Sequence, residues 1–409
     1  MPKDEILVGL DIGSTKVAVV AAQPEGESGL KVLGFAKSPS EGIKRGLIVD
    51  LEKVVGAIEA AVADARMVSG CKIKNVDAGI AGEHIKSINS RGVIAVGKGN
   101  SEISRSDVNR VVEAARAVAI PADREIIHVL PQEYTVDDQS GITDPVGMNG
   151  TRLEVSVHIV TGSIAAVANM VKAIEKADLE AGELVLGPLA SSYAVLNPEE
   201  RDLGCLLIDI GGGTTDIAVF LDGSIRHTAV LGIGGKNVTN DIAIGLRTPL
   251  EQAERLKCLH GCALSTLVGA DDLITVPGVA GRESREIARS VLASIIEPRA
   301  EEMFSLVARE LSRINLTESL TAGVILTGGG SKLAGLTELA EQIFDLPAKV
   351  ARPSVYYNDR QQDLEPELST AVGLVRYSQL NRTSGKKRAA GQRGQGLMAK
   401  IKNIFSEYF

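Results

Sequence analysis

CLLIDIGGGTTDIAVF, residues 205–220, is the most informative segment of this 409-residue chain. It contains an apolar run typical of a β-strand, an interruption at Gly211, Gly212 and Gly213 with an acid on each side, and a second apolar run. Because each glycine weakens a strand interior, three in succession indicate a turn with a function of its own. Glycine leaves backbone N–H groups open to a phosphate, and serine or threonine hydroxyls add donors with little bulk. The segment therefore predicts a hairpin that wraps a phosphate.

The same plan occurs near the N-terminus. ILVGLDIGSTKVAVVAA (6–22) and CLLIDIGGGTTDIAVFL (205–221) both contain an apolar strand, Asp-Ile-Gly, a turn of small and hydroxyl residues, and a second strand. Asp11 and Asp209 occupy matching positions 198 residues apart, beyond any solenoid period, so the pattern predicts two duplicated domains. One such hairpin alone can be an ordinary glycine turn, whereas two matched copies favour a shared site. A third strand follows each copy: LKVLGFAKS (30–38) and SIRHTAVL (224–231).

The acid at the end of each first strand needs an explanation, because carboxylates repel phosphates. Asp11 and Asp209 make sense if Mg²⁺ lies between carboxylate and phosphate, since magnesium favours carboxylates together with substrate oxygens. Each half of the chain would then supply one phosphate hairpin and one acid, and the two halves would close over a nucleotide between two lobes.

Other glycine-containing segments fit the same site. AGVILTGGGSKLAGL (322–336) predicts a strand that enters a glycine turn and then a helix, so that its backbone can lie against a flat ring or a ribose. GIGGKNVTNDIAIGL (232–246) predicts a glycine turn into a helix whose N-terminal N–H groups face phosphate. Glu254 and Lys257 share one face of a predicted helix; they either bond ribose hydroxyls or form an exposed helix ion pair.

Helical patterns alternate with these strands. Residues 104–121 open with a possible capping box, Ser104 with Asp107, and an inserted βαββ-like unit is predicted at about 83–160. The other predicted helices are 51–70, which ends in a capping glycine, 162–180, and 284–314 with an interruption at Pro298.

Composition limits the class of protein. A hydrophobic fraction of 44% with 23% charged residues is that of a soluble protein with real cores, and the length predicts two to four globular units. Because the sequence has neither a secretory signal nor about 18 consecutive apolar residues, we expect a cytoplasmic chain. Cys258, His260 and Cys262 have metal-ligand residue types, but a lone C-x3-C pair on a helix is usually structural.

The C-terminal segment differs in charge from the rest. Residues 382–409 carry seven Lys or Arg against one acid, a net charge of +6. Because the whole chain has a net charge of −8, the rest of it carries −14. This distribution argues against general nucleic-acid binding and favours an anionic partner at the end of the chain. Residues 381–395 are polar, basic and without periodicity, and they predict a flexible linker.

GLMAKIKNIFSEYF (396–409) predicts an amphipathic helix. Because so short a helix is marginal in water, it needs a surface on which to fold, and a bilayer interface with anionic headgroups offers one. The alternative is a helix that docks onto its own domain or a partner; the basic linker favours the membrane. The apolar stripe is Leu397, Ile401, Ile404, Phe405 and Tyr408, flanked by the basic residues Lys400 and Lys402.

These motifs resemble the actin/Hsp70/sugar-kinase ATPase superfamily, in which DIGSTK, LGPLASSYAVL (186–196), DIGGGTTD and LTGGGS have counterparts. GLDIGSTKV, GIAGEHIKSINSRG, AVAIPADREIIHVLPQEY, IRHTAVL, IEPRAEE and ILTGGGSKL are similar to the FtsA family of bacterial cell-division proteins, over about residues 5–380 and 396–409. The resemblance implies an α/β, actin-like two-lobed fold built from duplicated ribonuclease-H-like domains. The implied divisions are subdomain 1A (1–82 and 161–200), 1C (83–160), 2A (201–231 and 319–380), 2B (232–318), the linker (381–395) and the membrane-targeting helix (396–409).

The resemblance also implies the roles of individual residues. Asp11 and Asp209 would attend Mg²⁺, and the remaining residues would hold ATP or ADP. The phosphate-binding set is Gly13, Ser14, Thr15, Lys16, Gly211, Gly212, Gly213, Thr214 and Thr215, with Gly234, Gly235 and Asn237 from the following turn. The ribose and adenosine set is Glu254, Lys257, Gly328, Gly329, Gly330 and Ser331.

One position departs from the superfamily pattern. Hsp70-like relatives carry a glutamate directly before the proline of the connecting motif, where it positions the attacking water; here Gly187 precedes Pro188. Without a carboxylate, water is poorly oriented. Gln132, in the inserted unit, offers no defensible substitute. We therefore expect ATP binding with slow or negligible hydrolysis.

The resemblance implies an adaptor of cell division on the cytoplasmic face of the inner membrane at the septum. Such a protein polymerises, anchors FtsZ filaments of the Z-ring through subdomain 2B, and recruits later proteins such as FtsN through 1C. Arg285 and Arg299, expected on helices of 2B, are candidates to meet an acidic FtsZ peptide, or are ordinary solvated or helix-pairing arginines.

Three other classes compete with the adaptor. A sugar or acid kinase of the same superfamily needs a carboxylate base beside a substrate cleft and has no use for a lipid-seeking helix. An Hsp70-like chaperone needs a peptide-binding domain for which no residues remain after about 380. A PilM-like pilus-assembly protein shares the ATP fold but is not expected to carry this terminal helix.

Overall fold

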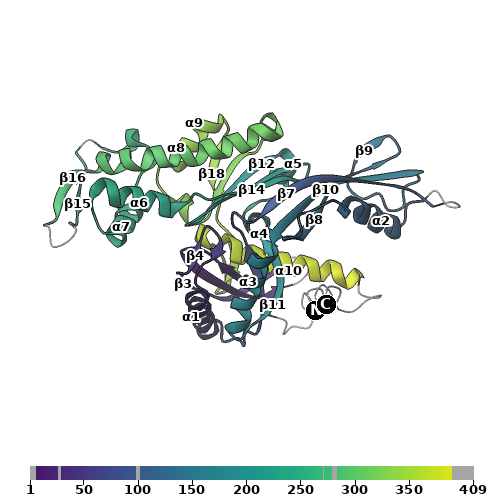
Figure 1. Cartoon of the computed structure of the whole chain (residues 1–409), viewed down its shortest axis with the longest axis horizontal. Coiled ribbons are helices and arrows are strands. Elements are labelled where there is room, and N and C mark those ends of the chain that lie inside the picture. The colour runs from purple at the N-terminus through teal and green to yellow at the C-terminus, as the bar shows by residue number, and fades with distance from the viewer. Residues whose placement is uncertain (1–5, 26–28, 98–101, 270, 279–282, 389–409) are drawn as a thin grey trace.

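The computed structural model describes residues 6–25, 29–97, 102–269, 271–278 and 283–388, with side chains as far as residue 381. Two β-sheets, formed by different parts of the chain, give the molecule two lobes (Figure 1). Each sheet begins with one of the duplicated hairpins. The two-lobed α/β architecture expected from the sequence is therefore confirmed.

The first lobe is built on a seven-stranded sheet. Its first hairpin pairs in antiparallel register from Leu7 with Ala22 to Ile12 with Val17. The strand order is β11 (Glu180–Leu186), β6 (Asn75–Ile80), β1 (Leu7–Ile12), β2 (Lys16–Glu25), β3 (Gly29–Pro39), β19 (Ser354–Tyr357) and β20 (Arg360–Asp363). A small hairpin of β4 (Ile43–Lys44) and β5 (Leu47–Ile48) follows β3.

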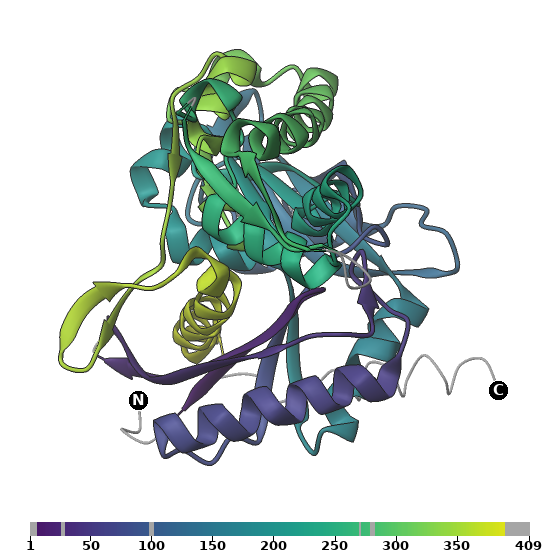
Figure 2. The same ribbon diagram turned by 90° about the vertical axis from the view of Figure 1, so that its left-hand side faces the viewer.

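Helices cover both faces of this sheet (Figure 2). α1 (Leu51–Ser69) and α3 (Ile164–Lys176) lie on one face, and α4 (Gly187–Val195) and α10 (Ser369–Arg388) lie on the other. α1 has the predicted ends: the Asp50 side chain accepts a bond from the Lys53 N–H, and Gly70 caps the helix at φ 67°, a left-handed conformation that suits glycine.

The second lobe is built on a five-stranded sheet. Its hairpin pairs from Cys205 with Phe220 to Ile210 with Thr215. The strand order is β14 (Ser224–Leu231), β13 (Thr215–Leu221), β12 (Cys205–Ile210), β17 (Gly323–Thr327) and β18 (Ala348–Val350). α8 (Arg289–Ile314) and α9 (Leu336–Phe344) bury one face of the sheet, α5 (Pro198–Leu203) leads into it, and η3 (Gly329–Lys332) and η4 (Pro366–Leu368) are short 3₁₀ helices.

α4 connects the two lobes. Leu189 and Ala190 of this helix belong to the same buried cluster as Leu10 of the first sheet and Leu207 and Ala218 of the second. The connecting motif predicted from the sequence is thus a helix between the two hairpins. Its buried side chains pack against strands of both sheets.

The inserted unit is a subdomain with its own sheet. Its sheet has the order β7 (Lys86–Ala95), β10 (Arg152–Ser163), β8 (Arg124–Val136) and β9 (Gln139–Ile142), and α2 (Arg105–Arg116) packs on it. The predicted capping box is present: Ser104 Oγ accepts from the Asp107 N–H (3.3 Å), and Asp107 accepts from the Ser104 N–H (3.0 Å).

This inserted subdomain also contacts the second lobe. Ser87 Oγ donates to the Thr228 carbonyl (2.8 Å), and Asn89 Nδ2 donates to the Arg226 carbonyl (3.2 Å). Gln132 donates to the Ile225 carbonyl (2.9 Å). These side chains satisfy carbonyls along β14, the edge strand of the second sheet. Gln132 therefore has a structural role between the inserted subdomain and the second lobe.

Subdomain 2B differs from its sequence prediction at the last helix. The predicted helix 284–314 with an interruption at Pro298 is instead β16 (Arg285–Ala288) followed by α8, which continues through Pro298. Ile296 and Ala300, on either side of the proline, are buried, and their packing holds the helix although one backbone hydrogen bond is missing. The other elements are α6 (Gly235–Leu246), α7 (Leu250–His260) and β15 (Leu273–Val276).

The end of the described chain corrects another prediction. α10 continues to Arg388, so residues 381–388 are helical and not part of a flexible linker. A helix already nucleated by its buried first half extends at little cost, even into polar sequence. Residues 389–395 and the predicted membrane helix 396–409 lie outside the described residues.

Two further expectations concern membranes and metals. Within the described ranges, none of the helices combines the length and apolar character needed to cross a bilayer. The described His, Cys, Asp and Glu side chains form no group of three or more that could hold a metal ion, so Cys258, His260 and Cys262 do not build one.

Candidate nucleotide-binding site

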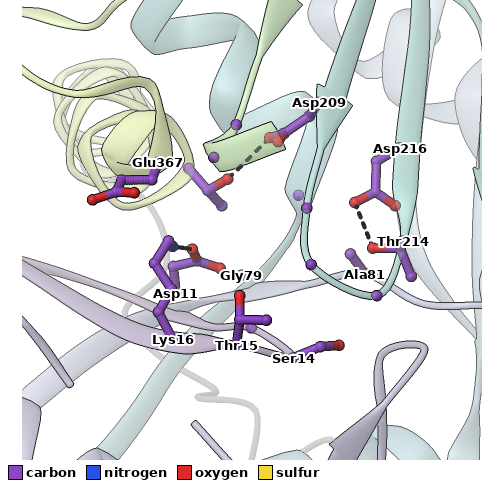
Figure 3. Close-up of a pocket in the computed structure, with 18 of the residues that line it drawn as sticks. Asp11, Ser14, Thr15, Lys16, Gly79, Ala81, Asp209, Thr214, Asp216 and Glu367 are labelled. Atoms are coloured by element: carbon purple, nitrogen blue, oxygen red, sulfur yellow. Dashed lines mark hydrogen bonds and ion pairs between the residues drawn. The ribbon is translucent and has the colours of Figure 1, made fainter. Parts of the chain in front are cut away.

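The two hairpins turn toward one pocket between the lobes (Figure 3). Asp11 and Lys16 approach it from the first hairpin, and Asp209 and Asp216 approach it from the second. Asp11 and Asp209, which the sequence predicts to share one site, thus line the same pocket. The predicted residues that line the pocket are Asp11, Gly13, Ser14, Thr15, Lys16, Asp209, Gly211, Gly212, Gly213, Thr214, Gly328 and Gly329.

The first turn is closed by one backbone hydrogen bond, from the Gly13 N–H to the Lys16 carbonyl (2.9 Å). The N–H groups of Ser14 and Thr15 donate to no other described residue, so both are free to bond an anion. Lys16 Nζ lies 2.5 Å from Asp11 Oδ2. The lysine expected at the phosphate is thus paired with the acid expected at the metal.

The second turn has the same construction. The Gly211 N–H donates to the Thr214 carbonyl (2.9 Å), and the N–H groups of Gly212 and Gly213 donate to no other described residue. Thr215 lies behind the turn, where its buried hydroxyl donates to the Ile233 carbonyl (2.9 Å). Thr215 is therefore a structural residue of the turn and not a direct phosphate contact.

The helix that follows this turn corrects a prediction. The N–H groups of Gly235 and Lys236, at the start of α6, donate to the carbonyls of Gly211 (2.9 Å) and Gly212 (2.8 Å). The Gly234 N–H donates to Asn237 Oδ1 (3.0 Å). These groups do not face a phosphate, because their hydrogen bonds hold the second turn from behind. Sequence reasoning missed this because the pairing depends on tertiary structure.

The environment of Asp209 raises its pKa to about 6. Burial is the main cause, since removal from water penalises the charged form, and the negative charge of Asp11 adds to it. Thr370 Oγ1 donates to Asp209 Oδ2 (3.3 Å), which lowers the pKa in part. An ionised Asp209 is therefore costly until a cation enters the pocket.

Asp216, the acid that follows the three glycines in the sequence, lines the site although the sequence analysis assigned it no role. It pairs in register with Asp209 across the second hairpin, lines the pocket and is 7% exposed. Burial, followed by the charges of Asp209 and Asp11, raises its pKa well above the usual value. Its Oδ1 has no hydrogen-bond partner among the described residues, while Oδ2 accepts from Thr214 Oγ1 (3.3 Å). The signal was the second aspartate of DIGGGTTD.

The glycine turn after β17 contributes part of its predicted set. Gly328, at φ 80°, and Gly329 line the pocket. A Cβ on Gly330 would lie 2.3 Å from Ile210 Cγ2, and the Ser331 hydroxyl donates to the Gly328 carbonyl (2.7 Å), so these two residues shape the turn from behind. Glu367 of η4 also lines the pocket and was not predicted.

Glu254 and Lys257 form the ion pair that was one of their two interpretations. Lys257 Nζ lies 2.7 Å from Glu254 Oε2 and donates to Thr239 Oγ1 (2.9 Å) and to the Gly235 carbonyl (3.1 Å). The pair joins α7 to the start of α6, beside the glycine turn. Contact with a ribose stays a prediction.

Gly187 lies at the first position of α4 and lines the pocket opposite Ala81. A Cβ on Gly187 would lie 3.2 Å from the Ala81 Cβ. Gly187, which stands where the sequence resemblance implies a water-orienting glutamate in Hsp70-like proteins, thus lines the pocket and presents no carboxylate.

The predicted partner residues lie on subdomain 2B. The sequence predicts Arg285 on a helix, but the structure places it on strand β16. Its side chain is exposed and donates to the Leu246 carbonyl (2.8 Å). Arg299 is on α8, with Nε 2.6 Å from Asp241 Oδ2 and a second ion pair to Glu302. The predicted membrane residues, from Leu397 to Tyr408, lie outside the described residues.

Duplicated hairpins facing one pocket, with a connecting helix between two sheets, define an actin-like fold. Solved structures support this class. A PilM–PilN type IV pilus biogenesis complex matches with a TM-score of 0.65 and 19% identity over 91% of this chain and 98% of that one. MreB 5 of Spiroplasma citri bound to AMPPNP matches with a TM-score of 0.55 and 15% identity over 95% and 98%. At these identities the likeness shows the fold alone.

The chain belongs to the family of the cell division protein FtsA. The family model "Cell division protein FtsA" matches residues 206–373, and "SHS2 domain inserted in FTSA" matches residues 82–161, the inserted subdomain. The cell division protein FtsA of Pseudomonas aeruginosa is 44% identical over 93% of this chain and 91% of its own length. That of Neisseria meningitidis is 40% identical over 98% of each. The cell-division role expected from the sequence is thus supported over the whole chain.

Proposed function

We propose that this protein is an actin-like adaptor of bacterial cell division that binds ATP with Mg²⁺ between its lobes. The observation that carries the proposal is the meeting of two matched hairpins at one pocket, each with free backbone N–H groups and an acid. Free N–H groups in a glycine turn bind phosphate, and a pocket between two lobes can close over a ligand.

The carboxylates fit a magnesium ion bound together with phosphate. Mg²⁺ is usually held by one or two carboxylates plus phosphate oxygens and waters, so Asp11 and Asp209 are sufficient. When bound, the ion would supply the positive charge that the buried Asp209 lacks. Asp11 would exchange its ion pair with Lys16 for the metal, and the released Lys16 ammonium would be free to bond a phosphate oxygen.

We infer slow hydrolysis from Gly187. The pocket presents no carboxylate at the place that orients water in relatives, and Asp216 is buried with a raised pKa. Nucleotide would therefore act mainly as a ligand that sets the angle between the lobes. MreB 5 of Spiroplasma citri, with the same fold, was solved with AMPPNP bound.

We infer that subdomain 2B binds the C-terminal peptide of FtsZ and that the inserted subdomain 1C meets later division proteins such as FtsN. Arg285 is exposed and pairs with no carboxylate of the described residues, so it is available to an acidic peptide. Arg299 already neutralises Asp241 and Glu302, which favours the structural alternative for that residue. Self-association into filaments is part of the same proposal.

We infer that residues 396–409 bind the membrane surface as an amphipathic helix. They would thereby hold the protein at the cytoplasmic face of the inner membrane. The apolar stripe and the two lysines suit an anionic headgroup region. The direct test is electron microscopy on anionic lipid monolayers, with ATP and without it. Filaments that need both lipid and ATP are expected. A protein that assembles identically without nucleotide, or does not bind the monolayer, contradicts the adaptor.

A further inference from the structure

Lys236 touches both phosphate hairpins at once. Its backbone N–H donates to the Gly212 carbonyl of the second hairpin (2.8 Å), and its side chain Nζ donates to the Ser14 carbonyl of the first hairpin (2.5 Å). The two ends of this connection lie in different lobes, 222 residues apart along the chain. A single residue at the start of α6 thus ties the turns of the two hairpins together.

The hairpins also touch directly beside this lysine. A Cβ on Gly212 would lie 2.3 Å from Thr15 Cγ2, and one on Gly213 would lie 2.6 Å from Ser14 Oγ. No side chain fits at either glycine without moving its neighbour across the cleft. The two lobes are therefore in van der Waals contact at their turns, and the lysine spans that contact.

A second contact across the lobes lies near the first. A Cβ on Gly232, directly after β14 of the second lobe, would lie 1.8 Å from Oε1 of Glu83, which lies between β6 of the first lobe and β7 of the inserted subdomain. Glu83 is held by Arg45, with Nη1 3.3 Å from Oε1. Close approaches at Gly212, Gly213 and Gly232 thus bring these segments together, and Lys236 adds a charged hydrogen bond to the Ser14 carbonyl beside the first two.

The lysine has no carboxylate of its own. Among the described residues, the neighbouring acids are engaged elsewhere: Glu41 pairs with Lys53 (2.8 Å), and Glu254 pairs with Lys257 (2.7 Å). The Lys236 ammonium is instead bonded to a neutral carbonyl. Such a bond is strong enough to hold a contact, yet it is replaced by water without leaving a buried carboxylate unpaired.

We propose that Lys236 is a latch that holds the phosphate end of the cleft closed and so sets how fast nucleotide is released. The proposal rests on the proposed function, because it names how the same site keeps its ligand. Lys236 does not line the pocket, and it acts through Ser14 as a positioning residue. Release of a triphosphate held by both turns requires the turns to separate, and separation breaks the Lys236–Ser14 bond.

The first test measures the dissociation rate of a fluorescent ATP analogue with Mg²⁺ from the full chain. Lys236→Gln keeps part of the aliphatic stem and a polar end but loses the charge, and it should release nucleotide about tenfold faster, as expected for loss of one charge-assisted hydrogen bond. Lys236→Arg should restore slow release. Lys176→Gln, which removes a surface lysine paired with Glu52, is the control and should leave the rate unchanged. If Lys236→Gln and the parent release nucleotide at the same rate, Lys236 does not set the rate of nucleotide release.

The second test needs no nucleotide. Hydrogen exchange of the unliganded protein is followed at the Gly13 and Gly211 N–H groups, whose bonds close the two turns. In Lys236→Gln, these two N–H groups should exchange faster than in the parent, while the unfolding temperature of the variant stays the same. In Lys176→Gln, the exchange rates should equal those of the parent. Equal exchange in Lys236→Gln and the parent overturns the latch, whether or not nucleotide binds. If no version binds nucleotide, the proposed function fails, and the exchange measurement alone still decides the latch.

Discussion

Burial and, after it, the negative charge of Asp11 raise the pKa of Asp209, although Asp11 and Asp209 lie in different lobes and 198 positions apart. An ionised Asp209, buried in this pocket near a second carboxylate, destabilises the empty protein, and a divalent cation would offset that cost. Asp209 should therefore lower the stability of the unliganded protein and strengthen the binding of a metal-bound nucleotide. Unfolding measurements test the first effect, and binding measurements test the second.

The stability side is tested with Asp209→Asn. The pKa of Asp209 rises from 3.8 to about 6 on folding, so the folded state binds the proton more tightly, and stability from this group is lost as the pH rises from about 4 to 6. Asparagine removes that loss. At pH 7.5 the variant should be more stable than the parent by about 3 kcal/mol, and the gain should vanish near pH 4. Denaturant unfolding in the absence of nucleotide measures it. Asp138→Asn, at a fully exposed aspartate, is the control and should leave the stability unchanged. If Asp209→Asn is less stable than the parent at pH 7.5, the raised pKa assigned to Asp209 is wrong.

Turnover is tested with Gly187→Glu. A glutamate at the start of α4 would place a carboxylate in the pocket, and ATP hydrolysis should rise roughly tenfold because water becomes oriented. The Cβ must displace Ala81 slightly, so Gly187→Gln is the matched control for bulk. Phosphate release under saturating ATP is the measurement. Robust ATP hydrolysis by the unmodified protein would contradict this explanation of slow turnover. So would a hydrolysis rate that rises equally in Gly187→Gln and Gly187→Glu.

The partner surface is tested with Arg285→Glu and Arg299→Gln. Arg285 is exposed, so reversal of its charge should weaken binding of an acidic FtsZ peptide several-fold without lowering the unfolding temperature. Arg299→Gln breaks the pairs with Asp241 and Glu302 and should lower the unfolding temperature while leaving peptide affinity unchanged. Fluorescence anisotropy with a labelled peptide separates the two. The assignment of Arg285 fails if its reversal leaves affinity unchanged.

The membrane segment is tested by liposome pelleting. Deletion of residues 396–409 should abolish binding to anionic vesicles. Replacement of Lys400 and Lys402 by glutamine should weaken it roughly tenfold or more, because each lysine contributes about 1 kcal/mol near a charged surface. Neutral vesicles should not distinguish this double variant from the parent. Unchanged pelleting after the deletion would rule out these residues as the anchor.

The fold was predictable because its deciding signals are local. Each hairpin is specified by an apolar strand, a glycine turn and a second strand, and the observed register places Asp209 beside the turn, as expected. The capping box at Ser104 is equally local. The continuous helix through Pro298 was not predictable, because packing of Ile296 and Ala300 decides it, and sequence periodicity does not report that packing.

The site was predictable in its residue types but not in its bonds. The sequence placed Gly235 and Asn237 near the phosphate turn, yet the N–H groups there bind the turn itself, which only the three-dimensional path of β13, β14 and α6 determines. Asp216 was given no role in the site because an aspartate in an alternating strand resembles an ordinary surface position. Lys236 was missed because its partner, Ser14, lies in the other lobe.

Titration calorimetry of ATP with and without Mg²⁺, on the parent and on Asp209→Asn, tests the site most directly. One nucleotide should bind per chain in a magnesium-dependent manner, and the asparagine variant should bind at least tenfold more weakly although it is the more stable protein at pH 7.5. No magnesium-dependent binding by the parent, or equal affinity in the variant, would mean that Asp11 and Asp209 do not jointly hold a metal-bound nucleotide.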